Sequence, residues 1–226
     1  NRAPWELDPE ALHDPAALPA LRLTVKARAG LGVVPTRLLG EPIYRERLRS
    51  CELRRRLSLV YEPYHDQLAA MARERRDRFG ASLVLDCHSM PTLPPILRTE
   101  RPVDAALGDR FGRSCHPALL EAAERCLAGA GLKVARNRPY AGGHITEHYG
   151  RPERGSHALQ LELRRGLFMH ETSHERHDGF AALQEVLGGL VRELGETMRA
   201  LTPPAVVLRP AAPHRPPADL PALRIA

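Results

Sequence analysis

The chain has 226 residues, of which 43% are hydrophobic and 27% are charged, and its formal net charge at pH 7 is +6. This length and composition suffice for one folded domain with a buried core, which excludes a fibrous or wholly disordered chain. No stretch approaches the roughly 20 consecutive apolar residues of a membrane helix, and no signal segment opens the chain, so a membrane protein is excluded as well.

The basic excess consists almost entirely of arginine, because only Lys26 and Lys133 among the 33 basic residues are lysines. Most arginines stand beside acids, as in residues 73–78, a pattern typical of a solvated helix face. A nucleic-acid binder instead gathers its cations in patches with aromatic residues, which make up only 4% of this chain. Nucleic-acid binding is therefore the weaker alternative, and it predicts steeply salt-dependent retention on DNA or RNA.

The four cysteines are scattered, with no spacing typical of a metal site or a disulfide framework. We expect reduced thiols and a cytoplasmic location.

The N-terminal third predicts irregular chain followed by two helices. Residues 1–20 are rich in Pro, Asp and Ala, and residues 21–25 alternate apolar and polar side chains as an extended segment or strand does. Helical spacing covers residues 44–60 and, after a break at Pro63, residues 64–79. We expect the second helix to face inward through Leu68, Met71 and Ala72 and to stop at Gly80.

The remainder predicts strands alternating with helices, which is typical of an α/β domain. Strands are expected at residues 81–85, 132–135 and 158–163, and helices at 116–129 and 178–200. The apolar strand 81–85 suits the middle of a sheet covered on both faces. From Pro203 onward seven prolines and few core residues predict a loosely attached tail, so the folded domain is expected to span residues 1–202.

A first polar segment, Asp86-Cys87-His88-Ser89, follows directly on the apolar strand. Ligand sites in open α/β sheets gather at the carboxyl ends of strands, and a neutral imidazole there is a good zinc ligand. Asp86 or a backbone carbonyl could orient the ring of His88. On this segment alone, a hydrogen-bonded structural histidine is the favoured alternative.

A second segment, residues 137–152, holds a Gly142-Gly143 turn with two histidines, a glutamate, two tyrosines and arginines, a composition that suits a functional loop. Glu162 then lies on an otherwise apolar strand, where a carboxylate needs a partner or a chemical role. Burial would raise its pKa toward the range of a general base. The alternative is a salt bridge to Arg164 or Arg165, although these two residues do not both share the face of Glu162.

These segments resemble the N-formylglutamate amidohydrolases of the zinc carboxypeptidase superfamily. The resemblance extends in order over most of residues 1–200, and its most specific stretch runs from His144 through Leu163. The other matching segments are residues 64–68, 85–91 and 107–112. The resemblance implies a single three-layer α/β domain with a mixed central sheet flanked by helices, and a single zinc ion (Zn2+).

The resemblance also implies roles for individual residues. His88 corresponds to the second histidine ligand of the zinc, and Glu162 corresponds to the general base. Asn1 and Arg2 match the end of an Asp-x-Asn-Arg motif that binds the substrate carboxylate. Tyr140 falls where carboxypeptidases carry a substrate-capping tyrosine. The superfamily's first zinc pair, a histidine and an acidic residue, precedes the Asn-Arg motif, so we expect it upstream of residue 1 in a longer parent protein.

Further loop residues are expected on the substrate side. Arg138 and Arg151 are the alternatives for binding a second carboxylate, and the sequence does not choose between them. His144 and His148 belong to the same expected substrate-binding set, and they do not replace the first zinc pair.

The function implied by the resemblance is zinc-dependent hydrolysis of the amide of an N-acyl acidic amino acid, foremost N-formyl-L-glutamate, as in histidine catabolism. The expected partner is this small-molecule substrate, with neither a membrane nor a nucleic acid, and the oligomeric state stays open. One alternative changes the substrate to another N-acyl amino acid or a small peptide. Another is a non-catalytic paralogue that binds an acidic ligand.

Overall fold

The computed structural model describes residues 1–38, 40–92 and 102–202, and its core is a mixed four-stranded sheet. The strand order is β3-β6-β4-β5, in which β4 runs antiparallel to β6 and the other neighbours are parallel. These strands are β3 (Ser82–Met90), β4 (Ala105–Gly108), β5 (Val134–Arg136) and β6 (Ser156–Arg164). A separate hairpin joins β1 (Arg37–Leu38) and β2 (Glu41–Pro42).

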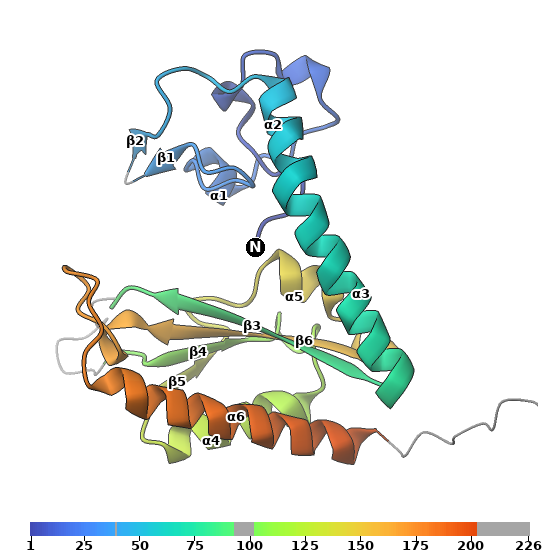
Figure 1. Ribbon diagram of the computed structural model, residues 1–226, viewed down its shortest axis with the longest axis vertical. Helices are drawn as coiled ribbons and strands as arrows, with labels where there is room; N and C mark the ends of the chain where they lie inside the picture. Colours follow the sequence, from blue (N-terminus) through green and yellow to red (C-terminus); the bar gives the residue numbers. More distant parts are fainter. Residues whose placement is uncertain (39, 93–101, 203–226) are drawn as a thin grey trace, which may run out of the picture.

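Helices cover both faces of the sheet, which gives the expected three-layer α/β arrangement (Figure 1). The two helices α4 and α6 lie on one face, and α5 lies on the other beside α3 (Figure 1), where Tyr149 of α5 is hydrogen-bonded to His65 of α3. The α-helices are α1 (Val25–Arg28), α2 (Ser50–Arg56), α3 (Glu62–Phe79), α4 (Pro117–Gly129), α5 (His144–Tyr149) and α6 (Gly179–Leu201). Short helical turns are η1 (Pro9–Ala11), η2 (Pro15–Ala17), η3 (Leu57–Tyr61), η4 (Pro152–Arg154) and η5 (Arg165–Leu167).

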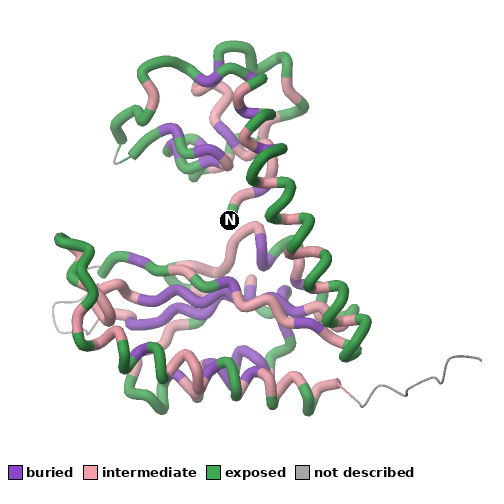
Figure 2. The backbone as a smooth tube through the Cα atoms, viewed as in Figure 1, coloured by how far each residue is buried: buried purple, intermediate pink, exposed green. Residues whose placement is uncertain are grey.

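The main core lies between the sheet and the pair α4 and α6. Leu159, Leu161 and Leu163 of β6 point into it, as their alternation predicts, and they are at most 6% exposed. The helix expected at 116–129 is confirmed as α4, and Leu119, Leu120, Ala123 and Leu127, which helical spacing puts on one face, are buried. Burial is concentrated in these strands and helices (Figure 2).

A second apolar cluster holds the N-terminal residues together apart from the sheet. Its buried members are Leu7, Leu12, Val34, Leu48, Leu53 and Leu57. We call residues 1–61 the N-terminal lobe. Its last two elements, α2 and η3, continue without interruption into α3, which connects the lobe to the sheet (Figure 1).

Several local predictions differ from the structure. Of the two alternatives for residues 21–25, a strand is not formed with the described residues; Thr24 is extended, and its hydroxyl accepts the Ala27 N–H and caps the short helix α1, which begins at Val25. The expected helix at 44–60 begins only at Ser50. The helix also does not break at Pro63, which has no N–H to donate. A π-helical turn precedes this proline, with the N–H of Glu62 donating to the Leu57 carbonyl, and the chain continues directly into α3.

Two further differences concern α3 and β3. Leu68 and Ala72 are half-buried as predicted, but Met71 is 48% exposed, while Gly80 ends α3 in the left-handed region at φ 81° as expected. The strand β3 was expected in the middle of the sheet, and within the described residues it lies at an edge, paired with β6 alone. The tail predicted for 203–226 lies outside the described residues.

No helix in the described ranges is long and apolar enough to span a bilayer.

Candidate active site

Four polar side chains share one face of the sheet where β3 and β6 lie side by side. In the parallel register Asp86 is opposite Gln160, and His88 is opposite Glu162. Residues two apart on a strand point to the same side, and partners in register do so too, so these four side chains form one patch. The leucines between them on β6 point to the main core on the other side of the sheet. We call Asp86, His88, Gln160 and Glu162 the strand-end patch.

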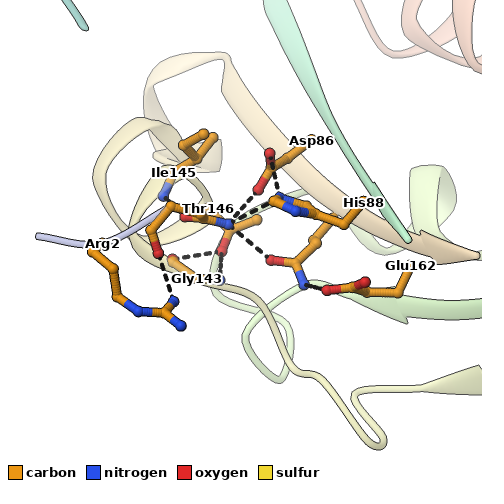
Figure 3. Close-up of polar contacts among 9 residues, drawn as sticks. Arg2, Asp86, His88, Gly143, Ile145, Thr146 and Glu162 are labelled. Carbon is orange, nitrogen blue, oxygen red and sulfur yellow. Dashed lines mark hydrogen bonds and ion pairs between the residues drawn. The ribbon is translucent and has the colours of Figure 1, made fainter. Parts of the chain in front are cut away.

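Asn1 contacts three side chains of this patch, and Figure 3 shows Asp86, His88 and Glu162 together with Gly143, Ile145 and Thr146. Its Nδ2 donates to Oδ2 of Asp86 at 2.6 Å and to Oε1 of Gln160 at 3.2 Å, and it lies 3.2 Å from Nε2 of His88. Its Oδ1 accepts the backbone N–H of Ile145 at 2.7 Å. The Asn1 amide is therefore held at both ends, which fixes the relative positions of β3, β6 and α5.

The glycine turn before α5 makes room for this contact. A Cβ atom on Gly143 would lie 2.5 Å from Nδ2 of Asn1, closer than side chains pack. Gly142 adopts φ 119°, and the Thr146 hydroxyl accepts the Gly143 N–H at 2.9 Å and donates to the Gly143 carbonyl. The turn predicted from the Gly-Gly pair is confirmed, and its reason is the close approach of Asn1.

The pKa values of His88 and Glu162 in the patch are both raised, but for different reasons. The hydrogen bond of Nε2 of His88 to Oδ1 of Asp86, 2.8 Å long, raises the pKa of His88 above its usual value. Burial raises the pKa of Glu162, with His88 acting against it. Glu162 is 9% exposed and accepts a hydrogen bond on Oε1 from Nε2 of Gln160 at 3.0 Å.

The expected alternative for Glu162, a salt bridge to the next arginines, is not seen. Arg164 pairs with Asp104 at 2.7 Å, and Arg165 donates a long hydrogen bond of 3.3 Å to Ser89. Glu162 therefore keeps a carboxylate without an ion-pair partner within the described residues, which suits a group that handles a proton.

A cavity of about 500 Å³ opens beside the patch, between the N-terminal lobe and the sheet. Five residues named from the sequence line it: Asn1, Arg2, His88, Tyr140 and Glu162. Arg2 is anchored on two carbonyls, with Nε donating to Leu31 at 2.7 Å and Nη1 to Asn1 at 2.8 Å. Lys26, Gln160 and Arg165 line it too; none of them was predicted as a site residue, and Arg165 was considered only as a salt-bridge partner of Glu162.

Comparison with known proteins gives this pocket a context. The family model for N-formylglutamate amidohydrolase matches residues 1–169. The chain belongs to the N-formylglutamate amidohydrolase family. The N-formylglutamate deformylase of Pseudomonas aeruginosa is 39% identical over 176 residues, which cover 76% of this chain and 65% of that protein. The Pseudomonas putida N-formylglutamate deformylase is 36% identical over 174 residues, covering 74% of this chain and 65% of that protein.

A solved structure agrees with this membership. The crystal structure of the N-formylglutamate amidohydrolase from Ralstonia eutropha has a TM-score of 0.81 and 36% identity, and the match covers 88% of this chain and 73% of that one. The chain thus spans a little under two thirds of the length of the two curated family members it matches.

Four residues expected on the substrate side lie apart from the pocket lining. Arg138 is exposed, and Arg151 donates from Nη1 to the carbonyls of Glu147 and Gly150. His148 and Arg151 line a different hollow, between α3 and the start of β3. His144 instead packs against other rings. From the loop of residues 137–152, Tyr140, Gly142 and Gly143 line the pocket.

We call this group of rings, Tyr61, His65, His144, His148 and Tyr149, the ring cluster. Nδ1 of His65 lies 2.8 Å from the Tyr149 hydroxyl, which also donates to the His65 carbonyl at 3.1 Å. The centroid of the His144 ring is 5.4 Å from that of His65 and 5.2 Å from that of His148. Burial, followed by the neighbouring histidines, lowers the pKa of His144 to about 4.

The described residues do not form a complete site for the zinc that the resemblance implies. A catalytic zinc takes three protein ligands, and no group of three His, Cys, Asp or Glu side chains within the described residues could hold a metal ion. In the patch, Nε2 of His88 is bonded to Asp86, which leaves Nδ1 as the other ring nitrogen. The residues present therefore fit one ligand of such a site and not the set.

Proposed function

We propose that the protein hydrolyses the amide bond of N-formyl-L-glutamate, giving L-glutamate and formate. Family membership and the names of the relatives support this substrate. The observation that carries the proposal is the pairing of His88 and Glu162 in register at the carboxyl ends of neighbouring strands, beside a cationic pocket. A substrate with two carboxylates suits such a lining, because arginine and lysine bind carboxylates through charge-assisted hydrogen bonds.

Glu162 is the general base in this proposal. Its burial raises its pKa toward the range in which a carboxylate takes and returns a proton near neutral pH. Gln160 holds Oε1, so we assign Oε2 to the attacking water. The water oxygen forms a bond to the formyl carbon, the carbon–nitrogen bond breaks, and the proton passes through Glu162 to the leaving amine.

Arg2 and Asn1 have different roles in this scheme. Arg2 is anchored at the edge of the pocket by two carbonyls and would bind the α-carboxylate. Both polar atoms of the Asn1 amide are already hydrogen-bonded, Nδ2 to the strand-end patch and Oδ1 to α5. We therefore assign Asn1 to positioning rather than to direct contact with substrate. Tyr140 lines the pocket and would close against bound substrate.

Zinc stays a proposal about His88 alone. A bound zinc would supply Lewis-acid chemistry, and His88 would be one of its ligands. Because the described residues provide no three-ligand set, no step above passes through the metal.

The test is formate release from N-formyl-L-glutamate by the purified protein, with bound metal measured in the same samples. We expect Glu162→Gln to lower kcat by about 10²–10⁴-fold, the range of general-base catalysis, with the fold intact. Glu147→Gln is the matched control, since Glu147 is an exposed carboxylate of α5 paired with Arg110. For the metal, His88→Ala should lower its content, whereas the exposed His13→Ala should not.

Three outcomes would count against parts of this proposal. Undiminished formate release by Glu162→Gln would remove the base. Binding of N-formyl-L-glutamate without any formate would favour the non-catalytic alternative. Release of acyl groups from other N-acyl amino acids only would keep the chemistry and change the substrate.

A further inference from the structure

The pocket beside the strand-end patch contains an unbalanced set of charges. Three cations line it, Arg2, Lys26 and Arg165, while Glu162 is the one carboxylate among the described lining residues. The cations come from different parts of the fold: Lys26 from α1 in the N-terminal lobe, and Arg165 from the first residue after β6. The lobe and the sheet face each other across this pocket (Figure 1).

Lys26 and Arg165 are also outside direct ion pairs, although Glu6 and Glu162 act on Lys26 at longer range, as Glu162 and Glu171 interact with Arg165. Neither forms an ion pair with another residue that the structure describes, whereas Arg164, next in sequence to Arg165, is paired with Asp104. Among the described residues, the side-chain hydrogen-bond partner of Arg165 is the Ser89 hydroxyl, 3.3 Å from its Nε. A guanidinium and an ammonium held at a cavity without an acidic partner are suited to bind an anion there.

The two cations lie at different places along the pocket. Lys26 lies beside Arg2, because the Leu31 N–H donates to the Lys26 carbonyl at 2.8 Å while the Leu31 carbonyl accepts a hydrogen bond from Nε of Arg2 at 2.7 Å. Arg165 instead follows the end of β6, where its Nε donates to the Ser89 hydroxyl of β3. Arg2 and Lys26 therefore form one cationic end, and Arg165 forms a second end beside Ser89.

We infer that Lys26 and Arg165 are the two residues that bind the carboxylates of a dicarboxylate: Lys26 joins Arg2 at the first carboxylate, and Arg165 binds the second and so provides the selectivity for it. This inference rests on the proposed function for its substrate, N-formyl-L-glutamate. Formylation removes the ammonium charge of glutamate, so the ligand presents two carboxylates and no cation. The formamide group, which is attached to the α-carbon of the substrate, then lies beside His88 and Glu162, which line the same pocket.

This assignment replaces the choice between Arg138 and Arg151 for the second carboxylate. Arg138 does not line the pocket, and Nη1 of Arg151 is taken up by two backbone carbonyls.

The test measures binding, so that it does not depend on turnover. Isothermal titration compares glutarate, which has two carboxylates, with pentanoate, which has the same chain length and one. We expect the wild-type protein to prefer glutarate by about 10–100-fold, the value of one charge-assisted hydrogen-bonded pair. Arg165→Gln should reduce this preference to about twofold or less with pentanoate affinity unchanged, and Arg165→Lys should retain part of it. Lys26→Gln should weaken both ligands by a similar factor.

Arg113→Gln is the matched control, because Arg113 is exposed and lies outside the pocket, and it should leave both affinities unchanged. Thermal melting of each variant checks that the fold is intact. A wild-type protein without preference for glutarate, or an Arg165→Gln variant that keeps the full preference, would overturn the inference.

Formate release separates this result from the proposed function. Hydrolysis of N-formyl-L-glutamate combined with no glutarate preference leaves the function standing and rejects the two residues. A glutarate preference that depends on Arg165, without any formate release, supports the dicarboxylate site and rejects the hydrolysis.

Discussion

The strand-end patch and the ring cluster both contain histidine, and their effects on the pKa of that histidine are opposite. In the patch a carboxylate raises the pKa of His88, and polar side chains face a cavity. In the ring cluster, burial and the other histidines lower the pKa of His144 to about 4. A histidine beside an acid is prepared to carry charge, whereas one packed among rings stays neutral and serves the packing of α3 against α5.

The comparison predicts that substitutions in or beside the patch reduce activity, while those in the cluster change stability and its pH dependence. The contrast matters because both regions contain motif-like histidines, and the sequence alone groups His144 and His148 with the substrate-binding residues.

After the loss of the general base, the largest effect is expected from Gly143→Ala, which pushes a methyl group into the Asn1 amide. The new Cβ would lie 2.5 Å from Nδ2 of Asn1, so Asn1 must leave the patch. We expect kcat/KM for N-formyl-L-glutamate to fall by about 10–100-fold, as for other losses of supporting hydrogen bonds, and stability to fall by about 1–3 kcal/mol. Gly129→Ala, with no atom within 4 Å of its added Cβ, is the control and should keep both values. Equal activity of the two variants would show that Asn1 does not organise the site.

Asp86→Asn is expected to act through His88. Removing the carboxylate removes the main cause of the raised pKa, so the pKa of His88 should fall. We expect kcat/KM to fall by about tenfold. NMR titration of the imidazole signals measures the pKa, and Asp66→Asn on the exposed side of α3 provides the comparison. An unchanged His88 pKa would refute the role given to the Asp86 hydrogen bond.

A smaller effect, on stability, is expected from the ring cluster at low pH. Because the pKa of His144 is about 4 in the folded protein and 6.5 as its ordinary value, the unfolded state binds the proton first as the pH falls. The free energy of unfolding should therefore decrease between about pH 6.5 and 4, with His144 contributing about 1–2 kcal/mol after allowance for its partial exposure. Urea unfolding at pH 7.5 and 4.5 should show a smaller decrease for His144→Phe than for the wild type. An equal decrease in both would contradict this assignment.

The smallest effect is expected from Tyr149→Phe, which removes a hydroxyl bonded to both Nδ1 and the carbonyl of His65. We expect a loss of about 0.5–1.5 kcal/mol in the free energy of unfolding, with formate release within about twofold of the wild type. Tyr64→Phe, on an exposed ring, should change neither. A large loss of activity in Tyr149→Phe would move the ring cluster into the functional site.

Much of the sheet core and half of the patch follow from the sequence, because they depend on local alternation. The spacing of Leu159, Leu161 and Leu163 places Glu162 on the other face of β6, and His88 follows the apolar start of β3. Gln160 could have been found by the same alternation, since it shares the face of Glu162.

The rest depends on contacts between distant parts of the chain. Asn1 meets Asp86 and Gln160 across 85 and 159 positions, and Lys26 lies on a four-residue helix whose place at the pocket no periodicity reveals. The edge position of β3 and the continuation of the helix through Pro63 likewise depend on tertiary pairing and on one π-helical turn. Local pattern thus predicts which residues face a surface, and the fold decides which surfaces meet.

The most direct test of the division between patch and cluster is NMR of the Glu162→Gln variant titrated with N-formyl-L-glutamate, which this variant should bind without turnover. The comparison predicts that the imidazole signals of His88 shift on binding, while those of His144 and His148 stay in place. Shifts at His144 and His148 with no change at His88 would contradict it and place the ligand at the ring cluster.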